Sequence, residues 1–171
     1  MSHSIIPLTK PPALLTIQSP GHTEKESEPF GFLCFNLDGE EYGVDLKLVC
    51  QVVKPPPVTW IPRLPSHLLG VVSIRGSVVT LMDLRQLMGL DATSWPRTAR
   101  VLIVEIGAEQ VGLLVDGVSQ VRRIHPDSLE KKPSLKESLS NDYVICVARP
   151  AGAGKPILII DLDTILLERL R

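Results

Sequence analysis

Aromatic side chains are scarce in this chain, at 4% of its residues, so the hydrophobic core must be built mainly from Val, Leu and Ile. Hydrophobic residues together make up 44%, which is ordinary for a folded protein and too high for a wholly disordered one. They occur in short runs, a pattern that favours strands over long helices. With 171 residues, the chain has room for one globular unit or for two small barrels that share a core.

A net positive charge is also missing. The chain has 18 Lys and Arg against 19 Asp and Glu, so it lacks the basic surface that binding to nucleic acid requires. No run approaches the roughly 18–20 apolar residues that span a bilayer, which predicts no direct membrane insertion. The N-terminal stretch is interrupted by Pro7, Pro11 and Pro12 and has no basic region before it, so we expect no secretory signal.

Cysteine is rare as well. Cys34, Cys50 and Cys146 are odd in number and far apart, and each lies in an apolar stretch. This pattern is typical of reduced core residues in a cytosolic protein rather than of a disulfide framework. We therefore expect a cytoplasmic protein.

Motifs for catalysis and metal binding are missing too. The glycine-rich segment 151–155 is followed by Pro156 and a strand rather than by a helix, unlike a phosphate-binding loop. Ser73 does not lie in a nucleophile elbow. The histidines show no ligand spacing with each other or with Cys and carboxylates; they are His3, His22, His67 and His125. We expect no catalytic residue, no metal and no cofactor, while a barrel enzyme or a small-ligand binder that uses a groove between barrels stays the alternative.

The chain divides into a tail and a folded part. Residues 1–29 are proline-rich and include a polar run at 21–28, which predicts a flexible tail. From residue 30 onward, apolar runs alternate with turn signals such as Asp38-Gly39 and Gly76. Ten short strands are expected, at 32–37, 42–46, 49–53, 69–75, 77–82, 101–106, 111–115, 118–124, 143–149 and 157–160. So many short strands in one domain indicate an all-β barrel or sandwich.

Two short helices interrupt the strands. The segment 83–89 begins with Asp83 as N-cap, has Gln86 three residues later as in a capping box, and ends at Gly89. The segment 161–171 likewise begins with an Asp and carries Arg in its last turn, which suits the helix dipole.

The second half of the chain repeats the first. Glu40, Gly43 and Gln51 align with Glu109, Gly112 and Gln120 at an offset of 69 residues, and Asp83 aligns with Asp161 at an offset of 78. We infer an internal duplication with halves at about 30–90 and 98–170, each giving a hairpin, a strand, a second hairpin and a helix.

Several motifs resemble the CheW-like domain of bacterial chemotaxis. They are Glu-Glu-Tyr-Gly-Val-Asp-Leu at 40–46, Pro-Val-Thr-Trp-Ile-Pro at 57–62, Ser-Ile-Arg-Gly at 73–76, Leu-Val-Asp-Gly-Val-Ser-Gln-Val at 114–121 and the closing Ile-Leu-Ile-Ile-Asp-Leu at 157–162. The similarity covers residue 30 to about residue 170, and the series of motifs in this order is more specific than any one of them.

This resemblance implies an all-β fold of two intertwined five-stranded SH3-like barrels, with short helices and a C-terminal helix. It also implies a non-enzymatic coupling protein with two partners: the regulatory domain of the chemotaxis histidine kinase and the cytoplasmic tips of methyl-accepting chemotaxis receptors. Such a protein is recruited to receptor arrays at the membrane. The positions that match receptor-binding sites are Arg75, Gly112 and Val115, and those that match kinase-binding sites are Val49, Gln51, Gly70 and Val78.

The chain departs from the family pattern at positions expected to lie on contact surfaces. Ser73 replaces the usual Asn before Ile-Arg-Gly, and Gln51 replaces a residue that is often acidic. Arg122 and Arg123 are basic where the family usually has an uncharged stretch. These changes keep open an alternative in which the chain is an adaptor of a specialised, non-motility chemosensory pathway.

Overall fold

The structure is a computed structural model that describes residues 28–91, 93–131, 143–150, 152 and 154–169. The tail expected at 1–29 lies outside this part of the chain except for its last two residues. Within the described ranges the chain forms eleven strands, two α-helices and two 3-10 helices. None of these helices is long and apolar enough to cross a membrane.

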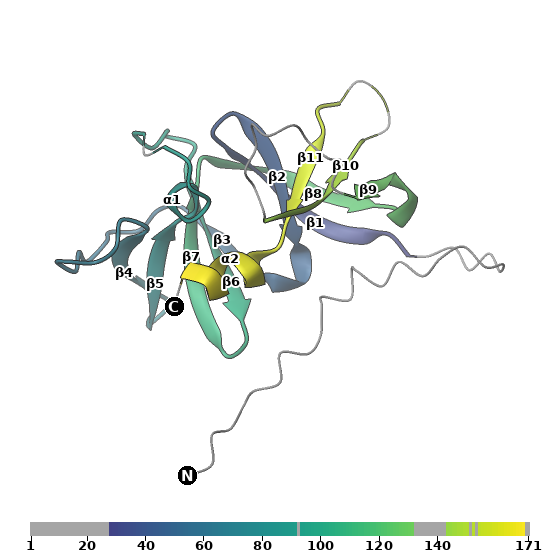
Figure 1. Cartoon of the computed structure of the whole chain (residues 1–171). Helices are drawn as coiled ribbons and strands as arrows, with labels where there is room; N and C mark the ends of the chain where they lie inside the picture. The colour runs from purple at the N-terminus through teal and green to yellow at the C-terminus, as the bar shows by residue number, and fades with distance from the viewer. Residues whose placement is uncertain (1–27, 92, 132–142, 151, 153, 170–171) are drawn as a thin grey trace, which may run out of the picture.

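The strands form two sheets (Figure 1). The six-stranded sheet has the order β8 (Gly117–Ile124), β1 (Phe30–Leu37), β2 (Glu40–Asp45), β11 (Ile157–Ile160), β10 (Val144–Ala148) and β9 (Leu129–Lys131). The five-stranded sheet has the order β3 (Val49–Val53), β6 (Arg100–Ile106), β7 (Glu109–Val115), β5 (Ser77–Asp83) and β4 (Leu68–Ile74). The helices are α1 (Leu84–Leu87), α2 (Leu162–Arg169) and the 3-10 helices Leu46–Leu48 and Pro126–Ser128.

Each sheet takes strands from both halves of the sequence. β1 and β2 lie between β8 and β11, while β6 and β7 lie between β3 and β5. Each strand of the five-stranded sheet has an expected counterpart in the other half of the sequence: β8 for β3, β1 for β6, β2 for β7, β11 for β5 and β10 for β4. Taken in this order, the counterparts give the order of the six-stranded sheet without β9. The expected all-β fold of two intertwined barrels is thereby confirmed. The symmetry also supports the duplication, although the boundaries of the halves stay a prediction.

The two parallel strand pairs, which join the halves, share one register. Leu81 of β5 lies opposite Gly112 of β7, and Ile159 of β11 lies opposite Gly43 of β2. A Cβ added at Gly112 would come within 3.2 Å of Leu81 Cδ1, and one added at Gly43 would come within 2.7 Å of Ile159 Cδ1. Glycine at these equivalent positions therefore allows strands from the two halves to approach each other.

The hairpin turns follow from local chemistry. Asp38 and Gly39 have φ values of 50° and 81°, so they form the expected two-residue turn between β1 and β2. Arg75 and Gly76 form the equivalent turn between β4 and β5, with φ values of 49° and 85°. The prediction that Arg75 ends a strand was therefore wrong, because both central residues of such a turn need positive φ.

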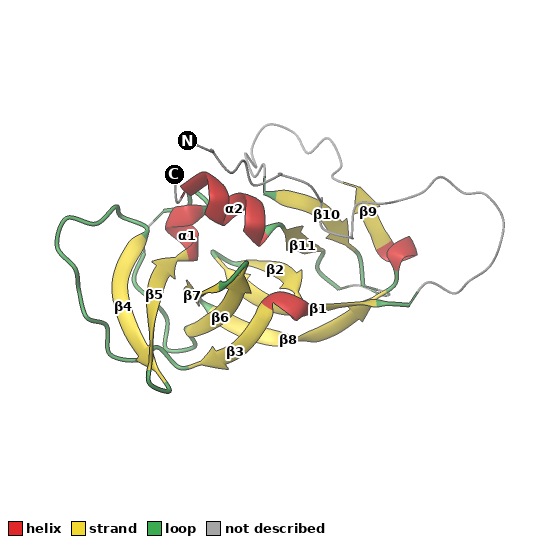
Figure 2. Ribbon diagram, turned by 90° about the horizontal axis from the view of Figure 1, so that it is seen from below, coloured by secondary structure: helices red, strands yellow, loops and turns green. Residues whose placement is uncertain are grey.

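The helices begin where expected; α1 ends at Leu87, earlier than expected, and the end expected for α2 lies outside the described residues. The Asp83 carboxylate accepts hydrogen bonds from the backbone N–H of Arg85 at 2.9 Å and of Gln86 at 3.3 Å, and Asp161 caps α2 in the same way. Gln86 does not complete a capping box, because its side chain donates to the carbonyl of Leu90 at 3.2 Å. Figure 2 shows α1 and α2 together on one side of the strands.

The sequence did not predict β9. This strand of three residues pairs with β10 and brings the larger sheet to six strands rather than five. Its counterpart in the other sheet is an isolated bridge, in which Thr59 pairs with Val71 of β4.

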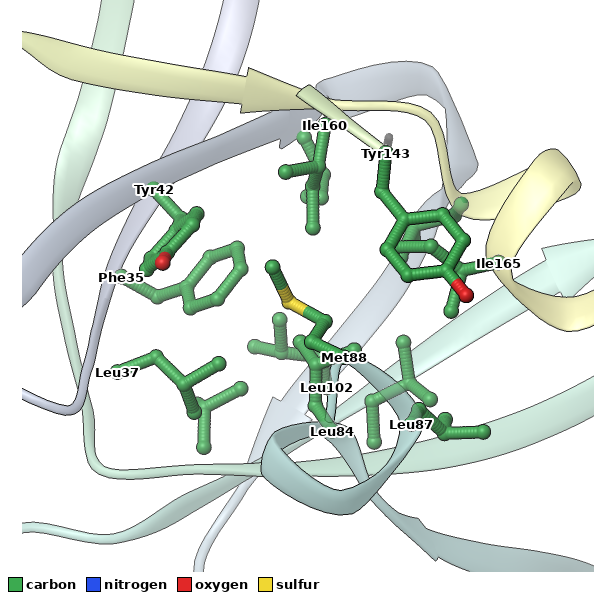
Figure 3. Packing of buried hydrophobic residues seen from close by; sticks show 14 of the residues in the cluster. Phe35, Leu37, Tyr42, Leu84, Leu87, Met88, Leu102, Tyr143, Ile160 and Ile165 are labelled. Carbon is green, nitrogen blue, oxygen red and sulfur yellow. The ribbon is translucent and has the colours of Figure 1, made fainter. Parts of the chain in front are cut away.

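The core has three parts. The largest hydrophobic cluster contains residues of both sheets and both α-helices, and Figure 3 shows Met88 extending between Phe35 and Tyr143. A smaller cluster fills each barrel. The one in the five-stranded barrel includes Val72, Val79, Val101 and Ile103, and the one in the six-stranded barrel includes Phe32, Cys34, Ile157 and Ile159. The two barrels therefore share a central core, as a pair of interlocked halves requires.

A buried ion pair links α1 to the connection between the two sheets. Arg85 of α1 pairs with Asp116, which lies where the chain passes from β7 in one sheet to β8 in the other; their side chains are 5% and 15% exposed. The second carboxylate oxygen of Asp116 accepts from the backbone N–H of Asp38 at 2.9 Å. The Arg85 guanidinium also donates to Thr93 and lies 4.2 Å from the ring centre of Trp95.

We expect Asp116→Ala to lower the free energy of unfolding by about 3–5 kcal/mol, because it leaves a buried guanidinium without its counter-charge. Urea denaturation followed by circular dichroism measures this change. Glu130→Ala is the matched control, since it breaks an ion pair with Arg149 whose side chains are 50% and 62% exposed. That control should cost less than about 1 kcal/mol, and equal costs for the two variants would contradict the assignment.

Candidate functional site

The hairpin of β4 and β5 carries the most exposed of the predicted binding residues. Arg75 is exposed at its tip, and Val78 on β5 is 75% exposed. Ser73 of β4, opposite Val78, is exposed as well. An apolar side chain this accessible gains free energy when a partner covers it.

Gly70 fixes the shape of β4. Its φ is +138°, and a Cβ added there would lie 2.3 Å from the carbonyl oxygen of Thr59. Thr59 forms two backbone hydrogen bonds with Val71, at 2.8 and 3.0 Å, so the segment before β4 is held directly against this strand. Glycine is needed because any side chain would push the two backbones apart.

Two exposed apolar residues at this site were missed from the sequence. Trp60 is 71% exposed and Ile61 is 44% exposed, and both directly follow the Thr59 bridge. Thr59 and Val78 flank β4 on its two sides, so these residues belong to one region. We call the exposed Trp60, Ile61, Arg75 and Val78, together with the buried Gly70 that shapes β4 beneath them, the β4 surface. The sequence feature that could have identified these residues is Trp60, a single tryptophan in the proline-rich segment 55–62 of a chain with few aromatic residues.

The other two residues matched to kinase binding lie on β3, at the opposite edge of the same sheet. Gln51 is half-buried opposite Ile103, and Val49 packs against the central core. The exposed side chains of this strand are Cys50 and Val52. The predicted kinase-binding set is thus divided between the two edge strands β3 and β4.

Gly112 and Val115, matched to receptor binding, are buried in β7. Gly112 is the site of close approach to Leu81, and Val115 is 0% exposed within the central core. Neither residue is accessible for direct contact with a partner. The prediction for these two positions is therefore limited to an indirect role, through the shape of β7 and of the corner that follows it.

The shifted pKa values among the described residues reflect burial. Burial raises the pKa of the Cys34 thiol to about 11, with a further contribution from Glu41, and burial alone raises that of Cys146 to about 11. Such thiols are unreactive at neutral pH. Burial also raises the pKa of Asp83, against the backbone hydrogen bonds it accepts as the α1 cap. Within the described ranges, no group of three His, Cys, Asp or Glu residues could hold a metal ion.

The fold and the β4 surface define a class of protein: a β-structured scaffold with exposed apolar and cationic edges. Comparison with known proteins agrees. The family model of the CheW-like domain matches residues 31–169. The chain is 30% identical to the chemotaxis protein CheW of Helicobacter pylori, over 84% of this chain and 85% of that protein. It is 29% identical to the chemotaxis protein CheW of Klebsiella aerogenes, over 79% and 80%.

The solved structures agree as well. The crystal structure of the scaffolding protein TtCheW from Thermoanaerobacter tengcongensis matches with a TM-score of 0.71 and 31% identity, over 81% of this chain and 92% of that one. The chain therefore belongs to the CheW-like domain family. It is a non-enzymatic coupling protein of the chemotaxis type, which confirms the adaptor function expected from the sequence.

We expect Gly70→Ala to destabilise the chain by roughly 2 kcal/mol or more, because it adds a backbone clash to a φ that L-residues rarely adopt. Amide hydrogen exchange should show lost protection at Thr59 and Val71, whose hydrogen bonds depend on this contact. Gly76→Ala is the control, since its φ is also positive but nothing lies within 4 Å of the added Cβ. It should leave both amides protected, and the same exchange pattern in the two variants would refute the role of Gly70.

Proposed function

We propose that the chain links the regulatory domain of a chemotaxis histidine kinase to the cytoplasmic tips of methyl-accepting receptors through its edge strands. The observation that carries this proposal is the β4 surface, where Trp60, Arg75 and Val78 are exposed around β4, and the Thr59 bridge holds the preceding segment against this strand. Trp and Arg are enriched among the residues that dominate binding energy at interfaces.

The kinase contact is assigned to the apolar part of this surface. Gly70 and Val78 lie on the β4–β5 hairpin, and Trp60 and Ile61 extend the apolar area beside it. Val49 and Gln51 would contribute from β3. Edge strands and hairpins offer a modest contact area, so stable assembly would depend on many repeated contacts in an array.

The receptor contact is assigned to Arg75. Its side chain starts from a turn that fixes the backbone at positive φ and is exposed to solvent. The exposed guanidinium of Arg75 can form two parallel hydrogen bonds with a carboxylate of a receptor helix. Gly112 and Val115 would contribute indirectly, by maintaining the conformation of β7. Recruitment to receptor arrays at the membrane would then follow from protein contacts alone.

Arg75→Glu should weaken binding to a receptor tip fragment by about tenfold or more, because it places like charges at the contact. Isothermal titration calorimetry measures the affinity, and circular dichroism should show an unchanged fold, since the side chain is exposed. Arg97→Glu makes the same charge change at another exposed loop position and should bind normally. Normal binding by the Arg75 variant would remove this residue from the receptor site.

Val78→Asp should reduce affinity for the kinase regulatory domain by about tenfold or more, and Trp60→Ala should do the same, since each removes exposed apolar area from the contact. Pull-down and calorimetry with the isolated regulatory domain provide the measurement. The control is Val121→Asp, because Val121 is 52% exposed but lies on β8 in the other sheet. A larger loss from the control than from Val78→Asp would place the kinase contact on β8 instead.

A second candidate is an adaptor role in a specialised, non-motility chemosensory pathway. It is favoured by the exposed Ser73 and the basic pair Arg122 and Arg123, which differ from the family pattern on accessible strands. Genes for a dedicated kinase and receptor next to this one, separate from motility genes, would support it, and a motility cluster would refute it.

A further inference from the structure

A cavity of about 340 Å³ opens at the end of the six-stranded barrel, on the sheet that does not carry the β4 surface. Its apolar lining consists of Ile124, Ala148 and Ile157, which are buried members of that barrel's core cluster. Its polar lining includes three arginines and a histidine: Arg122, Arg123, Arg149 and His125. The cavity therefore combines an apolar floor with a cationic rim.

The other barrel has an apolar residue at the position equivalent to Arg122. At the offset of 69 residues between Gly43 and Gly112, Arg122 corresponds to Val53. Both are paired with equivalent residues, Val53 with Val101 and Arg122 with Phe32. Val53 packs against the core of its barrel, whereas Arg122 lines the cavity. The first half therefore has an apolar residue at this position and the second half has a cation. Val53 shows that an apolar side chain is compatible with the fold here.

The cations at this rim are poorly neutralised. Arg149 pairs with Glu130 at 2.9 Å, but this pair is exposed and contributes little. Within the part of the chain that the structure describes, no carboxylate lies in ion-pair contact with Arg122 or Arg123. With its amide oxygen turned toward the guanidinium, Gln120 accepts from Arg122 at 2.7 and 3.2 Å, which holds this arginine in place. The rim thus presents an oriented excess of positive charge.

We propose that this end of the barrel binds an acidic, extended segment of a partner protein, with carboxylates on the arginines and one apolar side chain on the floor. Charge complementarity selects the acidic partner. β8 is the outermost strand on its side of the described sheet, so its outer backbone groups can pair with an extended chain. Val121, which is 52% exposed, adds apolar surface beside the cavity. This site is separate from the assigned kinase and receptor contacts and does not depend on them.

The test uses the full chain and a short fluorescent peptide rich in Glu with one central Leu. Fluorescence anisotropy should show binding that weakens as salt is raised, and amide shifts in NMR spectra should map it to the end of β8 and to Arg149. Arg122→Val, which introduces the residue of the other barrel, should keep the fold and lower the affinity about tenfold or more. Arg123→Glu should lower it as well, while Arg97→Glu serves as the matched control and should have no effect.

The outcomes separate the alternatives. Equal binding of a peptide with Gln in place of Glu, or an equal loss with Arg97→Glu, would overturn the proposal. Displacement of the peptide by inorganic phosphate at low concentration would make the cavity a small-anion site and would also overturn it. Because Arg122→Val should bind the kinase and receptor fragments normally, failure of this site is distinguishable from failure of the proposed function.

Discussion

The carboxylate of Asp116 links three parts of the chain at the connection between the two sheets. One oxygen pairs with Arg85 of α1, and the other accepts from the backbone of Asp38 in the β1–β2 turn. Its own backbone N–H donates to the carbonyl of Asn36 at 3.1 Å, and its carbonyl accepts from the Thr98 hydroxyl at 2.7 Å. A desolvated ion pair is favourable only when its partners are all in place, so this corner is stable only if both sheets are correctly joined. The corner thus adds a polar constraint to the shared core and the parallel strand pairs that join the two halves.

This constraint suits the function of the chain as a scaffold. The interior strands β1, β2, β6 and β7 are committed to the shared core, and the corner at Asp116 keeps them from shifting. In the described sheets, the outer strands β3, β4, β8 and β9 have an edge to offer to partners, and the hairpin of β4 with β5 adds the exposed side chain of Val78. A rigid framework lets these edges bind without a large ordering cost, which matters when each contact is modest and must be repeated many times.

The parts of the fold that depend on local chemistry could be predicted from the sequence. The Asp38-Gly39 turn and the Asp83 and Asp161 caps need only neighbouring residues, and they occur as expected. The features that were missed depend on distant residues. β9 exists because β10 pairs with it, and the position of Trp60 beside β4 follows from the bridge between Thr59 and Val71. The burial of Val115 likewise reflects a central core that only the intertwined fold creates.

The two halves also differ where they meet solvent, and this difference has a consequence for assembly. With a valine at position 122, as at position 53 in the other half, both barrels would have an apolar residue at this end and would present similar surfaces. A pseudo-symmetric protein with equivalent ends would bind like surfaces at both and could grow without control. An arginine at one end and valine at the other make the ends chemically different, although Lys54 beside Val53 is the counterpart of Arg123. Divergence after duplication at this one position would therefore let the proposed acidic segment distinguish the two ends.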